Sequence, residues 1–228
     1  MKQISVIIIF LLFLVAGCKS DVSGDADESI PDAGVEDYTA SEYASIFEMS
    51  EMFEIPYADA DKAGEDDSNM CWAAVTANVL TWAGWAADED DTFDIFKSHF
   101  ENKPGYVYDA LRYYLDAYAA GVSAEMVTVR ETRSSLLLDF IVSALHEGKG
   151  VIIKIKTPNK SVGHLLTIYG YRRLIKEKNF VLYFTDSDDH LHKIRYLKMD
   201  WNNATDRWEA HGSYSDWYLE YVISLARY

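Results

Sequence analysis

The chain has 228 residues, and its 21 basic and 37 acidic side chains give it a formal charge of −16. This excess of acid argues against nucleic-acid binding and against electrostatic attachment to a membrane surface, because both targets are anionic. The charge is compatible with a protein or peptide partner but does not select one, and nothing in the composition sets an oligomeric state.

The N-terminus is typical of an exported lipoprotein. An apolar run from Ile4 to Val15 follows Lys2, and it is too short to span a bilayer but suits the core of a signal peptide. The run leads into Val-Ala-Gly-Cys18, which resembles the bacterial lipobox; an ordinary secretory signal with a chance cysteine is the alternative. We expect residues 1–17 to be removed and Cys18 to be lipidated, so that acyl chains anchor the protein to the bacterial cell envelope, at the outer membrane or cell surface, without spanning it.

Residues 18–40 form a predicted flexible tether. After the lipidated Cys18, residues 19–40 carry seven acidic side chains and one basic side chain, with Ser, Gly and Pro between them. Such a stretch has too little apolar surface to offset the entropy of ordering it. The folded domain is therefore expected over residues 41–228, and these roughly 190 residues suffice for one sizeable core.

Helices dominate the predicted first half of this domain. Apolar residues recur at helical spacing within several segments, and Gly84 and Gly148 stand where two of the helices should end. Ser68 or Asn69 is the expected N-cap of the helix that begins at Cys71. The predicted helices cover residues 41–53, 71–85, 91–100, 104–120 and 134–146.

Strands dominate the predicted second half. Short runs rich in β-branched and aromatic residues are separated by Gly, Asn, Asp and Ser. Helices followed by a run of antiparallel strands indicate an α+β domain. The predicted strands cover residues 150–156, 164–172, 180–185, 192–197, 206–211 and 217–225.

Cys71 is the residue that most strongly suggests chemistry. The sequence holds two cysteines, and lipidation of Cys18 would leave Cys71 as a lone thiol without an internal disulfide partner. It is then either a passive core residue or a nucleophile. A thiol at a helix N-terminus faces the positive end of the helix dipole, which lowers the pKa of the thiol and favours the reactive thiolate.

Two further residues fit a nucleophilic site in chain order. His164 opens a predicted strand and Asp186 ends the next one, so the carboxylate could orient the imidazole that serves Cys71 as base. A helix-borne cysteine followed by a strand-borne histidine and a third polar group is the papain-like arrangement. Taken singly, each has a structural explanation: a packed cysteine, a structural histidine and a turn aspartate.

Four motif islands resemble the IdeS/Mac immunoglobulin-degrading cysteine peptidases. They lie at residues 64–74, 78–82, 163–170 and 183–188, and the segment Thr-Asp-Ser-Asp188 is the most distinctive. The resemblance implies a papain-like fold, Cys71 as nucleophile, His164 as general base and then acid, and Asp186 as the orienting carboxylate. It also implies Asp188 as a support for the site, Lys62 as a side chain near the oxyanion, and immunoglobulins as candidate protein substrates.

Other interpretations stay open at this point. Bacteriocin-processing double-glycine peptidases share the Cys-His-Asp order but usually have proline where Ser187 follows Asp186. Transglutaminase-like enzymes share the order too, and a catalytically silent lipoprotein that only binds a host protein is a different class of answer. The proposed chemistry needs no cofactor, and we predict no metal: the acidic run at 186–189 lacks the glycine and the distal glutamate of the common calcium loop.

Overall fold

The computed structural model describes residues 58–62, 67–120, 125–129, 136–158, 163–174, 179–188, 194–211 and 214–228. The predicted signal peptide, Cys18, the tether and the predicted helix over 41–53 lie outside these residues. The described elements, in chain order, are α2 (Cys71–Trp82), α3 (Glu89–Phe100), α4 (Val107–Tyr118), β1 (Met126–Val129), α5 (Leu136–His146), β2 (Gly150–Lys156), β3 (Gly163–Leu174), β4 (Asn179–Thr185), β5 (Arg195–Asn202), β6 (Arg207–His211) and β7 (Tyr218–Leu225).

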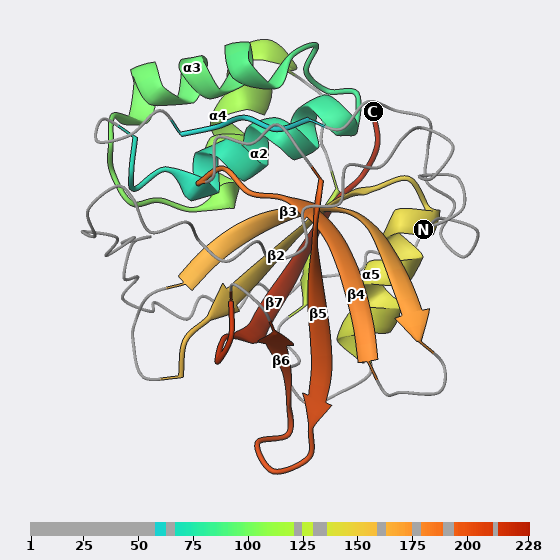
Figure 1. Ribbon diagram of the computed structural model, residues 1–228. Helices are drawn as coiled ribbons and strands as arrows, with labels where there is room; N and C mark the ends of the chain where they lie inside the picture. The colour runs from blue at the N-terminus through green and yellow to red at the C-terminus, as the bar shows by residue number, and fades with distance from the viewer. Residues whose placement is uncertain are drawn as a thin grey trace, which may run out of the picture.

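The elements form a mixed helical and antiparallel-sheet domain, in agreement with the predicted α+β class. Figure 1 shows α2, α3 and α4 grouped above one end of the sheet, while α5 lies beside the strands. Within the described part of the chain, no helix is long and apolar enough to cross a membrane.

The described strands form one antiparallel sheet in the order β1-β7-β2-β3-β4-β5-β6. The sheet also curls back on itself, because Glu209 of β6 pairs with Tyr218 of β7. The Ala210 N–H of β6 donates to the Trp217 carbonyl at 2.7 Å, which strengthens this closure. The strands from β7 round to β6 thus make a barrel-like ring, with β1 added outside β7.

Strand β2 is buried on both faces, and this explains its continuous run of β-branched residues. Ile152 belongs to the apolar cluster beneath α2, whereas Ile153 and Ile155 belong to the cluster that contains α5. Successive side chains of a strand point to opposite faces, so one strand contributes to two cores. Full burial of each such side chain contributes about 1.5–3 kcal/mol to stability.

Helix α2 is buried on nearly all sides, with α3 and α4 on one side and β2 and β3 on the other. Its alanine-rich sequence lets these neighbours approach closely, and Gly84, with a positive φ of 81°, follows its end as predicted. The predicted N-cap is wrong, since Met70 holds that position and no side chain caps the helix. The Ser68 hydroxyl and the Asn69 N–H bond instead to Asn102, which fixes the start of α2 to the loop after α3.

Most other predicted elements agree with the structure to within a few residues. Helix α4 begins at Val107, so Pro104 precedes the helix and does not lie in its first turn. Strand β5 runs to Asn202, further than predicted, and residues 191–193 lie outside the described residues. Strand β1 was not predicted; its four residues pair only along β7 among the described strands.

Asn78 links α2 to both of the segments that flank it. Its Oδ1 accepts a hydrogen bond from the Ala60 N–H at 2.7 Å, and its Nδ2 donates to Thr167 Oγ1 of β3 at 3.2 Å. The side chain is fully buried. Because buried polar groups are costly when unpaired, these bonds fix where α2 sits on the sheet.

We predict that Asn78→Ala lowers the free energy of unfolding by about 1–3 kcal/mol, because it leaves a buried N–H and a buried hydroxyl without this partner. Chemical denaturation followed by circular dichroism measures the change. Ser143→Ala is the matched control: it also removes one side-chain hydrogen bond, to Glu147, but on an exposed part of α5. Equal stability of the two variants would contradict the importance of the Asn78 bonds.

Candidate active site

Cys71 is the first residue of α2 and is completely buried. It belongs to the same apolar cluster as Leu165, the residue that follows His164 on β3. The expectation of a lone thiol is wrong for this structure, in which Cys71 is disulfide-bonded.

His164 and Asp186 are brought together as the sequence predicted. His164 is the second residue of β3, and Asp186 directly follows β4, the neighbouring strand. The His164 Nε2 and Asp186 Oδ1 atoms are 2.7 Å apart, and both side chains are buried. The carboxylate therefore holds the imidazole through Nε2, which leaves Nδ1 as the nitrogen that can serve another group.

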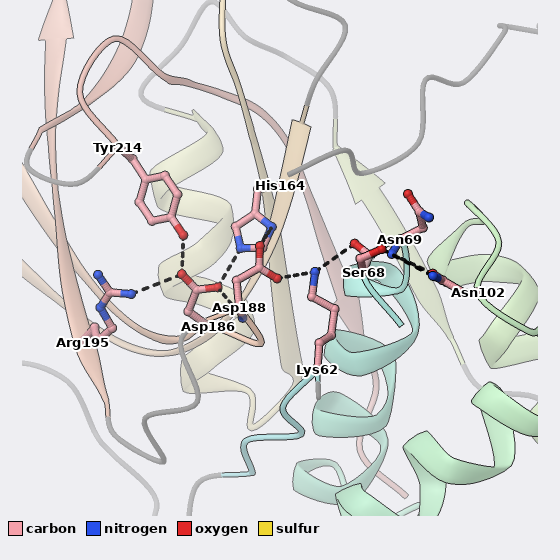
Figure 2. Close-up of polar contacts among 9 residues, drawn as sticks. All are labelled: Lys62, Ser68, Asn69, Asn102, His164, Asp186, Asp188, Arg195 and Tyr214. Carbon is pink, nitrogen blue, oxygen red and sulfur yellow. Dashed lines mark hydrogen bonds and ion pairs between the residues drawn. The ribbon is translucent and has the colours of Figure 1, made fainter. Parts of the chain in front are cut away.

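Both oxygens of Asp186 accept more than one hydrogen bond (Figure 2). Oδ1 accepts from His164 and from the Asp188 N–H at 3.1 Å. Oδ2 accepts from Arg195 Nη1 at 3.3 Å and from the Tyr214 hydroxyl. Burial alone would raise the pKa of this carboxyl, but the His164 charge and the hydrogen bonds outweigh it and lower the pKa well below its usual value.

Burial and neighbouring charges also act in opposite directions on the pKa of His164. Burial lowers the pKa of the imidazole, while the charges of Asp186 and Asp188 and the hydrogen bond to Asp186 raise it, and the net pKa is above the usual 6.5. The imidazolium form is thus favoured inside the protein. An imidazolium is the partner that a thiolate needs in a cysteine–histidine pair.

Lys62 lies between the start of α2 and the histidine. Its Nζ donates to the Ser68 carbonyl at 3.1 Å and forms an ion pair with Asp188 Oδ1. Asp188 Oδ2 in turn lies 3.7 Å from His164 Nδ1. Figure 2 shows the lysine side chain beside the start of α2, with its Nζ between Ser68 and Asp188. The two residues that the resemblance added, Lys62 and Asp188, therefore lie beside the histidine.

The same groups also have the spacing of metal ligands. Ligand atoms of His164, Asp186 and Asp188 lie within 4.8 Å of one another. However, the Lys62 ammonium and the Arg195 guanidinium already contact these carboxylates. A metal cation placed among them would be repelled by both positive charges, so the arrangement fits an ion-paired cluster better than a metal centre.

Comparison with known proteins agrees with this chemistry. The model of the Peptidase_C39 like family matches residues 53–216. The chain belongs to this family. A search of the curated proteins gives no match.

Membership in the Peptidase_C39 like family indicates a cysteine peptidase, hence a hydrolase with protein or peptide substrates. The matched segment contains Cys71, His164 and Asp186. The match supports the cysteine peptidase part of the sequence resemblance but does not confirm the narrower IdeS/Mac assignment. It is partly compatible with the double-glycine peptidase alternative.

Arg195 and Tyr214 were not predicted from the sequence. For Arg195 a signal exists: it alternates with Tyr196 and lies in phase with Leu197 and Met199, so a charged residue occupies an inward position of β5. Such a residue requires a buried partner. Tyr214 lies between β6 and β7, where no periodicity points to Asp186.

We predict that Asp186→Asn lowers the His164 pKa, because the substitution removes a negative charge while the burial that disfavours imidazolium remains. Since folding raises this pKa above 6.5, the stabilisation that comes from the raised His164 pKa is complete below pH 6.5 and is lost as the pH rises through the raised value. NMR titration of the imidazole protons measures the shift. Asp200→Asn, which removes a carboxylate 2.9 Å from the exposed His211, is the control. An unmoved His164 midpoint in Asp186→Asn would count against the pair.

Proposed function

We propose that the protein is a papain-like cysteine endopeptidase in which Cys71, His164 and Asp186 carry out hydrolysis. The observation that carries this proposal is the buried 2.7 Å contact between His164 Nε2 and Asp186 Oδ1. Lys62, which contacts Asp188 and the Ser68 carbonyl, connects this region to the end of α2 that bears Cys71. Membership in a cysteine peptidase family supports the reaction class.

The reaction proceeds through an acyl-thioester. The Cys71 thiolate attacks the scissile carbonyl carbon and forms a C–S bond. Protonated His164 then gives its proton to the leaving amine as the C–N bond breaks. In the second half, His164 takes a proton from water, the resulting hydroxide attacks the thioester, and the thiolate leaves. Because Nε2 is held by Asp186, Nδ1 is the nitrogen that exchanges these protons.

Lys62 supplies positive charge near the developing oxyanion in this mechanism, together with the Cys71 N–H. An ammonium has three donor hydrogens, and the contacts to Ser68 and Asp188 use two of them. The contacts seen among the described residues therefore leave one donor for a substrate oxygen. The buried position of Lys62 strengthens its electrostatic effect, because low dielectric screens it less than water does.

The substrate class rests on the sequence islands. Their resemblance to immunoglobulin-degrading peptidases favours host proteins, with immunoglobulins as the first candidates. The double-glycine alternative predicts cleavage after a Gly-Gly pair in a leader peptide. Ser187 stands where proline usually follows the aspartate in that group, and this favours the first substrate class.

We predict that Cys71→Ala abolishes hydrolysis of serum proteins while the fold is retained. The wild-type protein is expected to need a thiol reductant, because Cys71 is disulfide-bonded and a sulfur in a disulfide cannot attack a carbonyl. Gel electrophoresis and mass spectrometry of a serum digest, with and without reductant, measure activity and cleavage sites. Ser143→Ala, a change at an exposed position of α5, is the matched control and should keep full activity.

The substrates are separated by running IgG, IgA, IgM and a double-glycine leader peptide in parallel. If none of the immunoglobulins yields hinge-region fragments, immunoglobulins are excluded as the substrate class. Cleavage after Gly-Gly would support the double-glycine alternative. Transfer of the acyl group to an added amine would favour a transglutaminase-like enzyme. A Cys71 that a thiol-directed peptidase probe cannot label in the reduced protein would favour a binding lipoprotein without catalysis.

The proposed place of action is the bacterial cell envelope, with the enzyme anchored through lipid on Cys18. Residues 18–40 separate the anchor from the domain, and the acidic side chains of this segment repel anionic lipid headgroups. The catalytic domain is thereby held at a distance from the membrane, so that a large protein substrate can reach it.

We predict that radiolabelled palmitate is incorporated into the protein in the bacterium and that Cys18→Ala prevents this labelling and releases the protein from the membrane fraction. Autoradiography and cell fractionation measure both effects. Cys71→Ala serves as the control, because it removes the other cysteine and should leave labelling intact. Equal labelling of Cys18→Ala and the unmodified protein would exclude Cys18 as the lipidated residue.

A further inference from the structure

We propose that Tyr214 is a positioning residue that acts through Asp186; this inference rests on the proposed function. Tyr214 comes from the connection between β6 and β7, and its hydroxyl donates to Asp186 Oδ2. The other oxygen, Oδ1, is the one that holds His164. The tyrosine thus fixes the carboxylate from the side opposite the histidine.

The hydroxyl determines how the carboxylate is rotated. A carboxylate turns easily about its Cβ–Cγ bond, which is a broad torsion. The Asp188 N–H on Oδ1 and the donors on Oδ2 together keep Oδ1 aimed at Nε2. Arg195 also donates to Oδ2, but at 3.3 Å, near the long limit of a hydrogen bond. Tyr214 therefore provides the closer of these two constraints on Oδ2.

The aromatic ring of Tyr214 is itself held in place. It stacks on the imidazole of His164, with ring centroids 5.9 Å apart and an interplanar angle of 27°. It also makes edge contacts with Phe184 and Trp217. The Trp217 N–H donates to the Tyr214 carbonyl at 3.0 Å, so the backbone is fixed as well. One side chain therefore orients both the carboxylate and the imidazole.

Tyr214 acts as a donor and does not exchange protons. Burial and the neighbouring Asp186 charge raise the pKa of its hydroxyl well above the usual value. The hydroxyl keeps its proton across the pH range in which a cysteine–histidine pair works, so it always presents a donor to Oδ2. The tyrosine touches neither substrate nor the scissile bond in this mechanism.

We predict that Tyr214→Phe lowers kcat about tenfold or more, since a hydrogen bond to a charged group is lost, while KM changes less than about twofold. The phenyl ring keeps the stacking contacts, so only the hydroxyl is tested. Steady-state kinetics on a peptide cut by the reduced protein give both constants. The rate at which iodoacetamide alkylates Cys71 gives a second readout that requires no substrate, and it should fall as well.

The same substitution on an Asp186→Ala background separates positioning from a general structural role. Without the carboxylate the hydroxyl has nothing to orient, so Tyr214→Phe should then change neither kcat nor the alkylation rate. Tyr108→Phe, which removes an exposed hydroxyl on α4, is the matched control and should behave like the unmodified protein. Thermal unfolding checks that each variant is folded.

Two results would overturn the role of Tyr214: an equal effect of Tyr214→Phe with and without Asp186, or unchanged kcat and alkylation rate in Tyr214→Phe. The Cys71→Ala protein is run alongside. Hydrolysis that survives in Cys71→Ala overturns the proposed function itself, whereas Cys71-dependent hydrolysis that is insensitive to Tyr214→Phe overturns only the role of the tyrosine.

Discussion

The buried carboxylate of Asp186 is the group on which the arrangement around it depends. An isolated carboxylate removed from water costs several kcal/mol, so burial is tolerated only with enough donors. Those donors come from separate elements: His164 on β3, Arg195 on β5, Tyr214 between β6 and β7, and the Asp188 N–H of its own turn. The anion is stable only when these elements are all in place. Folding of the sheet and assembly of the site are therefore the same event.

The closure of the sheet is what makes this donor set possible. Strand β6 follows β5 at the far end of the sheet, and the single β6–β7 pairing brings the chain back toward β7 and β2. The connection that carries Tyr214 lies at this closure. In an open sheet of the same strand order, β6 would end at a free edge and its connection to β7 would have to cross the whole sheet. The barrel-like ring thus has a consequence for the candidate site, because it brings the tyrosine to Asp186 at the end of β4.

Local signals predicted the residues whose position follows from a helix or strand boundary. The hydrophobic spacing and the turn residues between elements sufficed to place three residues: Cys71 at a helix start, His164 at a strand start and Asp186 at a strand end. Contacts between distant segments could not: Tyr214 reaches Asp186 across 28 positions, and Ser68 and Asn69 lost their expected capping role because Asn102, far along the chain, bonds to them. The disulfide state of Cys71 was missed because no local pattern in the sequence reports the redox state of a sulfur.

Cys71 belongs to the apolar cluster beneath α2, whereas Tyr214 packs against the cluster that contains α5, so the alignment of these residues requires directional contacts. Apolar packing is non-directional and permits small slides of α2 against the sheet, whereas hydrogen bonds constrain both distance and angle. Lys62 supplies such constraints at both ends. Its backbone N–H donates to the Ser187 carbonyl at 2.9 Å, and its side chain bonds to Ser68 and Asp188. The turn that carries the aspartates is thereby tied to the start of the cysteine-bearing helix. Lys62 thereby aligns the turn beside His164 with the start of the helix that bears Cys71, and this geometry does not depend on the charge of the lysine.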